Sequence, residues 1–171
     1  MLRRFSRDSR GTAAVEFAFV APVMLLMYFG MAEMTQAMMA SRRASHVAST
    51  VGDLVTQSSS LNQAAVDDIF SIGDTIMKPF PTGTLAIRFS SIKADNVGAL
   101  SVACTKHKGS FGDLTSTAGL PSGLLTTNDS IIVAEAKYTY TSPLQKALPN
   151  PITFTSTYYL KPRKSSEVAC L

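Results

Sequence analysis

The feature that most constrains this chain is an apolar stretch near the N-terminus, residues 12–32, in which Glu16 is the only charged residue. About 21 residues at a rise of ~1.5 Å each make a helix of roughly 31 Å, which is long enough to cross the hydrocarbon core of a bilayer. We therefore expect a transmembrane helix that must tolerate one carboxylate.

The residues before this stretch are basic: Arg3, Arg4, Arg7 and Arg10 stand against a single acidic residue, Asp8. Positive charge beside an apolar span favours an N-terminus in the cytoplasm, with the rest of the chain exported. This leader carries most of the formal charge of +4, so the remainder is nearly neutral. A nearly neutral remainder argues against a nucleic-acid-binding protein, which needs a basic face.

Three kinds of N-terminal segment fit this pattern. A cleaved signal peptide has small residues available at Gly30 and Ala32, but its apolar core is usually only about 7–15 residues long. An uncleaved anchor explains the length but gives no role to Gly11 or Glu16. A prepilin explains both, because a peptidase that cuts after Gly11 leaves a charged amine on Thr12. In a filament, that amine can neutralise the Glu16 carboxylate of a neighbouring subunit, whereas the simpler alternative is that Glu16 only snorkels to the interface.

The motif Gly-x-x-x-x-Glu-Phe at residues 11–17, preceded by a basic leader, resembles the prepilin motif of tight-adherence (Tad/Flp) pilus systems. Several further segments are similar to TadE-like pseudopilins: residues 10–18, Pro22, and residues 30–33, 120–124 and 131–140. The resemblance implies processing after Gly11 by a prepilin peptidase, and a minor pilin required for pilus assembly and surface adherence. It implies that Glu16 and Phe17 act in subunit assembly.

The same resemblance implies partners and a location. The partners are other pilins and pseudopilins of the Tad system, the prepilin peptidase, the inner-membrane assembly platform and the lipid bilayer. The N-terminus is expected in the cytoplasm and the C-terminal domain in the periplasm, with incorporation into the extracellular pilus left open. The alternative function is an uncleaved single-span scaffold of the pilus export apparatus.

The helical pattern continues past the membrane, which predicts a basic leader at 1–11, a transmembrane helix at 12–33, a helical stalk at 34–60 and a pilin-like domain at 61–171. Pro22 removes one helical hydrogen bond, so a kink is expected nearby. Five methionines form one helical stripe, which is either an adaptable packing or lipid-facing surface or the seam with other pilin helices. They are Met24, Met27, Met31, Met34 and Met38.

A second helix is expected from Leu61, with Asn62 as its N-cap, and Pro79 ends it. Four stretches then alternate apolar and polar residues, as half-buried strands do: 85–90, 100–105, 132–140 and 152–160. Residues 95–98 form a hairpin turn, and 106–128 a long loop. The predicted fold class is α+β, with an N-terminal transmembrane helix that extends into a stalk, a second helix and a roughly four-stranded antiparallel sheet.

The two cysteines, Cys104 and Cys170, form a disulfide if the domain is exported, because the compartment is then oxidising. Free thiols, or a metal site with His46 and His107, are the alternatives. Otherwise, the sequence shows no nucleophile–base arrangement and no phosphate-binding glycine loop. We therefore expect no enzyme, no cofactor, no metal and no nucleic-acid partner.

Overall fold

The long N-terminal helix α2 (Arg10–Thr56) continues through Pro22 in a computed structural model that describes residues 10–121 and 123–171. The basic leader predicted at residues 1–11 therefore lies almost wholly outside the described residues. The helix ends at Thr56, within the stalk predicted at 34–60, and the polar residues 57–60 follow it. Two compact units share this helix: one joins the part up to Met38 with Thr141–Pro151, and the other comprises Met39–Tyr140 with Ile152–Leu171.

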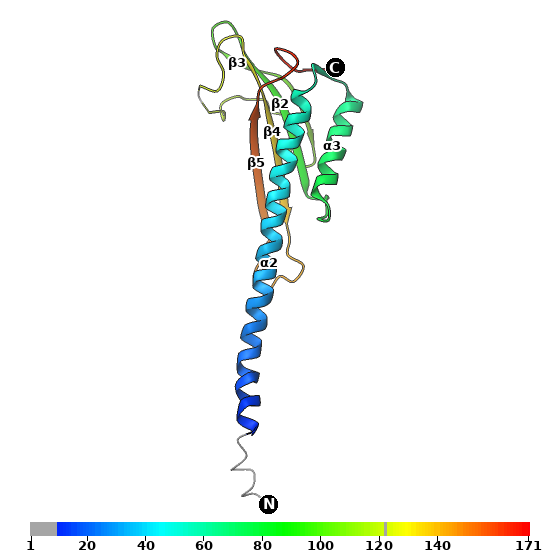
Figure 1. Ribbon diagram of the computed structural model, residues 1–171. Coiled ribbons are helices and arrows are strands. Elements are labelled where there is room, and N and C mark those ends of the chain that lie inside the picture. Colours follow the sequence, from blue (N-terminus) through cyan, green and yellow to red (C-terminus); the bar gives the residue numbers. More distant parts are fainter. Residues whose placement is uncertain (1–9, 122) are drawn as a thin grey trace, which may run out of the picture. The chain divides into compact units, whose positions relative to one another are not determined.

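A four-stranded antiparallel sheet forms the centre of the larger unit (Figure 1). Its strands are β2 (Leu85–Ala94), β3 (Leu100–Lys108), β4 (Ser130–Tyr140) and β5 (Ile152–Leu160), and their order is β3-β2-β4-β5. The central strands β2 and β4 are buried along most of their length, whereas the edge strand β5 alternates half-buried and exposed residues. The α+β fold class predicted from the sequence is confirmed.

Two helical segments cover one face of this sheet: α3 (Gln63–Met77) and the part of α2 after Met39 (Figure 1). Glycines permit the close approach. A Cβ added at Gly52 would lie 2.5 Å from Leu160 Cδ1 on β5, and one added at Gly73 would lie 2.5 Å from Ile87 Cδ1 on β2. At Gly52 the added Cβ would also lie 2.9 Å from the Cβ of Ala134, which cannot rotate away, so glycine lets α2 lie close to the sheet there. At Gly73 the contact is with the end of the Ile87 side chain, which can rotate aside. The core between them includes Val47, Val51, Val66, Phe70, Ile87, Phe89, Ile132, Ala134 and Ala136.

Side chains determine both ends of α3. At its start, Asn62 accepts a hydrogen bond of 2.9 Å from the backbone N–H of Ala65, and Leu61 and Val66 are both buried, as a hydrophobic staple requires. At its other end, the Arg43 guanidinium donates to the carbonyl of Ile76 at 2.9 Å. A cation at a helix C-terminus also stabilises the helix dipole.

The opposite face of the sheet is covered by the loop between β3 and β4, of which residues 109–121 and 123–129 are described. Three buried residues of the sheet, Ile92, Ile131 and Val133, form a small hydrophobic cluster there. Partly buried leucines pack against it: Leu100, Leu114, Leu120, Leu124 and Leu125. The sequence predicts only a long loop in this region, and the structure extends β3 to Lys108 and gives the loop its own hydrophobic contacts.

Two very short strands were not predicted. β1 (Ser60–Leu61) and β6 (Ala169–Cys170) pair in parallel, with Ser60 opposite Ala169 and Leu61 opposite Cys170. The pairing is completed by hydrogen bonds from the N–H of Ala169 to Ser59 and from the N–H of Leu171 to Leu61. It holds the C-terminal segment beside the connection between α2 and α3.

Candidate functional site: the N-terminal helix

The four residues predicted for processing and assembly lie in the first two turns of α2. Gly11, Thr12, Glu16 and Phe17 are all exposed, and among the described residues nothing outside the adjoining helix backbone lies within 4 Å of a Cβ built on Gly11. Thr12 and Glu16 are four residues apart and share one face of the helix. In the described part of the chain, no basic side chain forms an ion pair with Glu16. The Gly11–Thr12 bond and the Glu16 carboxylate are therefore both accessible.

The apolar side chains that follow are exposed on all sides of the helix. Phe19 is 73% exposed, and Val15, Val20, Val23, Leu25, Leu26, Tyr28 and Phe29 are exposed as well. A soluble monomer rarely leaves so large an apolar surface in water. The helix is long and apolar enough to cross a membrane. These properties indicate that this end of the chain is associated with a membrane.

The five methionines form one exposed stripe, as their spacing predicts. Met27, Met31, Met34 and Met38 line a shallow apolar groove of about 470 Å³ together with Gly30, Thr35 and Ala147. The thioether side chains are flexible and polarizable, so a surface of this kind adapts to differently shaped neighbours.

Glu33 has a structural role that the sequence does not predict. It is only 1% exposed, and its carboxylate accepts hydrogen bonds from the backbone N–H groups of Lys146, Ala147 and Leu148 at 2.9, 2.8 and 2.8 Å. The sequence shows only a charge directly after an apolar span, which normally indicates contact with water. Nothing in the local pattern relates it to a loop more than a hundred residues further along the chain.

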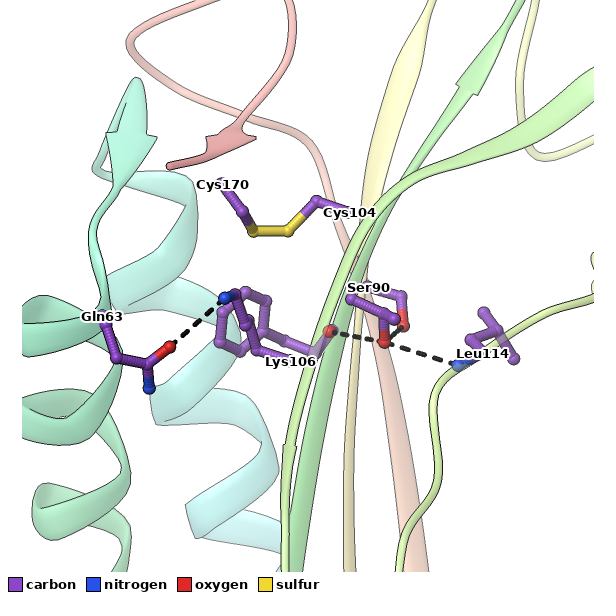
Figure 2. The surroundings of a disulfide bond; sticks show 8 residues. Gln63, Ser90, Cys104, Lys106, Leu114 and Cys170 are labelled. Carbon is purple, nitrogen blue, oxygen red and sulfur yellow. Dashed lines mark hydrogen bonds between the residues drawn. A yellow bond between two sulfur atoms is a disulfide. The ribbon is translucent and has the colours of Figure 1, made fainter.

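Cys104 on β3 and Cys170 on β6 are joined by a disulfide across 66 residues, with their Cα atoms 5.8 Å apart (Figure 2). On the same face of β3, the Lys106 ammonium donates to the Gln63 side chain of α3 at 3.2 Å. On the other face, Thr105 hydrogen-bonds Ser90 and accepts from the N–H of Leu114 in the covering loop. The disulfide therefore lies where sheet, helix and C-terminal segment meet.

The residues considered as an alternative metal site do not converge. Both cysteines are in the disulfide, and His107 pairs with Asp113, its Nδ1 lying 2.9 Å from the carboxylate. His46 is an exposed residue of α2. Within residues 10–121 and 123–171, no three histidine, cysteine or acidic side chains gather in a way that could hold a metal ion.

Comparison with known proteins gives one match. Residues 11–53 fit the family model described as TadE-like protein, and this match begins at Gly11 and includes Glu16 and Glu33. No curated protein and no solved structure matches the chain. The match confirms the resemblance seen in the N-terminal motif. It associates the chain with the Tad pilus system and with the other components of that system.

Proposed function

We propose that this chain, a TadE-like protein by the match of residues 11–53, is a minor pilin, or pseudopilin, of a tight-adherence pilus. Its role is to support pilus assembly and surface adherence. The observation that carries the proposal is the accessible Gly11 at the start of an exposed apolar helix, with Glu16 on the next turn. The precursor lies in the inner membrane, with its N-terminus in the cytoplasm and its larger unit in the periplasm.

The proposed first step is cleavage between Gly11 and Thr12 by a prepilin peptidase. Gly11 has no side chain, and no other part of the described fold packs against it, so once the first helical turn unwinds no side chain shields the bond from the peptidase. Cleavage removes the basic leader and creates an α-amino group on Thr12, which is largely protonated at neutral pH. That ammonium supplies the positive charge that the Glu16 carboxylate of a neighbouring subunit needs in an apolar surrounding.

The proposed second step is extraction of the helix from the bilayer and packing against other pilins. The side chains that contact lipid in the membrane then contact neighbouring helices, and the methionine stripe adapts to their shape. The partners are the other pilins and pseudopilins and the assembly platform of the inner membrane. This role is structural: the chain acts through its surfaces rather than as an enzyme, and it uses no cofactor.

The deciding experiment is N-terminal sequencing of the membrane-extracted protein, from cells with and without the prepilin peptidase. The expected sequence is Thr-Ala-Ala-Val-Glu when the peptidase is present, and the original Met1 start when it is absent. A functional protein that keeps Met1 in the presence of the peptidase would contradict the pilin proposal.

Gly11→Ala separates processing from folding. Alanine has open space at this position and favours a helix by about 1 kcal/mol over glycine, so the variant should fold normally. We expect uncut protein that retains its leader. Gly83→Ala is the matched control, because it also has nothing within 4 Å of the added Cβ and lies far along the chain. It should be cut like the unmodified protein.

The second candidate is an uncleaved single-span scaffold of the export apparatus. One observation favours it: α2 begins at Arg10, so the helix runs through the Gly11–Thr12 bond without a break. A helical backbone engages its own peptide groups in hydrogen bonds, and a peptidase would have to unwind the first turn. The sequencing experiment distinguishes the two functions directly.

A further inference from the structure

We propose that the loop Thr141–Pro151 is a second membrane-contacting element, which rests in the interface of the bilayer on the exported side. It presents Leu144 to the acyl chains and Lys146 to the phosphate headgroups. The inference rests on the proposal that α2 spans a membrane, and it does not depend on cleavage at Gly11 or on a role in the pilus.

The contacts of this loop fix its level along the helix. Three successive backbone N–H groups, those of Lys146, Ala147 and Leu148, donate to the Glu33 carboxylate. A Cβ added at Gly30 would lie 3.5 Å from the Cβ of Ala147. Gly30 belongs to the apolar span and Glu33 directly follows it. Because each residue rises only ~1.5 Å, the loop touches the helix at the level where the span ends.

Glu33 makes such a position possible for a loop. Backbone polar groups beside lipid must find partners within the protein, since no water is available to them. A carboxylate offers about four acceptor sites, and here three N–H groups occupy it. The Ser142 side chain also hydrogen-bonds Glu33. The three prolines of the loop have no N–H group that needs an acceptor. They are Pro143, Pro149 and Pro151.

The exposed side of the loop has the chemistry of an interface. Leu144 is 45% exposed although it is a large apolar residue, and the exposed Lys146 carries a positive charge, which attracts anionic headgroups. Ala147 forms one wall of the apolar groove lined by Met27, Met31 and Met34. The apolar surface of the helix therefore continues onto the loop. Because lipid surrounds that surface in a membrane-spanning helix, lipid is also the expected contact of the loop.

Tryptophan fluorescence tests this contact cleanly, because the chain contains no tryptophan. Leu144→Trp is reconstituted as the full chain in vesicles of phosphatidylcholine and phosphatidylglycerol, with and without bromine on the acyl chains. Phe19→Trp reports the membrane span. Val97→Trp, at a position 80% exposed in the turn between β2 and β3, reports water. We expect brominated lipid to quench Leu144→Trp and Phe19→Trp, and to leave Val97→Trp unchanged.

The outcomes distinguish the loop from the anchor. If only Phe19→Trp is quenched, the loop proposal is overturned and the membrane span stands. If Leu144→Trp emits at short wavelength but is not quenched, a protein surface covers the loop, which also overturns lipid contact. If Phe19→Trp is not quenched, α2 does not span the bilayer, and both the anchor and this inference fail.

Glu33→Gln tests the proposed mechanism in the same assay. A glutamine has one acceptor oxygen in place of two and an NH₂ group that cannot accept. Since Lys146 donates to one carboxylate oxygen and Ala147 and Leu148 donate to the other, at least one of the three N–H groups loses its acceptor and faces an NH₂ donor instead. In the Leu144→Trp background, Glu33→Gln should abolish quenching and shift the emission to longer wavelength. Phe19→Trp with Glu33→Gln should remain quenched, and the Cys104–Cys170 disulfide should still form. Unchanged quenching of Leu144→Trp would refute the role of Glu33.

Discussion

Arg88 on β2 and Glu135 on β4 lie directly opposite each other in the antiparallel sheet and form a close ion pair. Arg88 Nη2 and Nε lie 2.6 and 2.7 Å from the same carboxylate oxygen, and the two side chains are only 14% and 15% exposed. Arg88 also donates to the carbonyl of Gly112 at 3.0 Å and lies over the ring of Phe111. The pair therefore attaches the loop between β3 and β4 to the sheet.

Glu135→Gln should lower the free energy of unfolding by about 1–3 kcal/mol, because a partly buried charge-assisted hydrogen bond is lost and Arg88 keeps its charge. Thermal unfolding of the full chain in detergent measures the change, and limited proteolysis should cut the loop faster. Glu167→Gln is the matched control. Its pair with Lys93 spans 3.5 Å and is about half exposed, so its loss should cost less than about 1 kcal/mol. Equal effects would contradict the assigned role.

Gly109→Ala should be among the most damaging single changes in the larger unit. Gly109 has φ +77°, and an added Cβ would lie 2.7 Å from the carbonyl oxygen of Leu85 and 2.9 Å from the Cα of Ala86. The positive φ alone costs roughly 1–2 kcal/mol for a residue with a side chain, and the clash with backbone adds to it. We expect a clearly lower melting temperature than for Gly112→Ala, where the added Cβ meets nothing within 4 Å.

Loss of the disulfide should destabilise the larger unit by about 4 kcal/mol in the chain-entropy model for a loop of 66 residues. Cys104→Ser and Cys170→Ser should have similar effects, and the double variant should be little worse than either one. Thermal unfolding with and without reductant measures this. Cys104→Ser has no disulfide to reduce, so a reductant should not change its melting temperature. If the reductant lowers the melting temperatures of this variant and of the unmodified chain equally, the destabilisation by reductant is not due to the disulfide.

Stability in acid should depend on Asp129. A hydrogen bond from the Lys161 ammonium, followed by one from the N–H of Ser130, holds the pKa of Asp129 below its usual value despite partial desolvation. A group whose pKa is lowered on folding contributes stability above its unfolded-state pKa and loses it as the pH falls through the folded-state pKa. The contribution should be present above the ordinary pKa value of 3.8 and should be lost as the pH falls below it.

Asp129→Asn should therefore lower the melting temperature at neutral pH, and the difference from the unmodified chain should narrow in acid. Lys161→Gln removes the partner and should give the same narrowing. If the melting temperatures of the variant and the unmodified chain differ by the same amount at every pH, the contribution of Asp129 does not depend on its charge.

Glu16→Gln should leave folding and cleavage intact and reduce the number of pili. The side chain is exposed, so the substitution should cost little folding stability, whereas the proposed pairing with the Thr12 amine of a neighbour requires its charge. Pili counted by electron microscopy, with N-terminal sequencing of the same cells, give the result. Glu16→Asp, which keeps the charge, should restore part of the assembly. Normal piliation in Glu16→Gln would exclude charge pairing.

Local sequence patterns determined much of this protein. Each of three patterns involves residues that are close together in the sequence: the apolar run after Gly11, the Asn62 cap before α3, and the alternation in the four strands. The sequence alone therefore predicts the two helices and the four strands. The N-terminal motif also lies within seven consecutive residues, 11–17, which made the TadE-like resemblance visible without any knowledge of the fold.

The sequence predicts the Cys104–Cys170 disulfide because the chain has only two cysteines, but the other contacts described between residues far apart in the chain came only from the tertiary structure. Glu33 and the N–H groups of residues 146–148 meet because the chain returns to the helix after β4. The leucines of the loop between β3 and β4 are partly buried because the sheet offers them an apolar face. The pairing of Ser60 and Leu61 with the C-terminal segment has the same origin. A hydrogen bond or a hydrophobic contact depends on distance in space, and a local pattern contains no information about which distant residue the fold brings near.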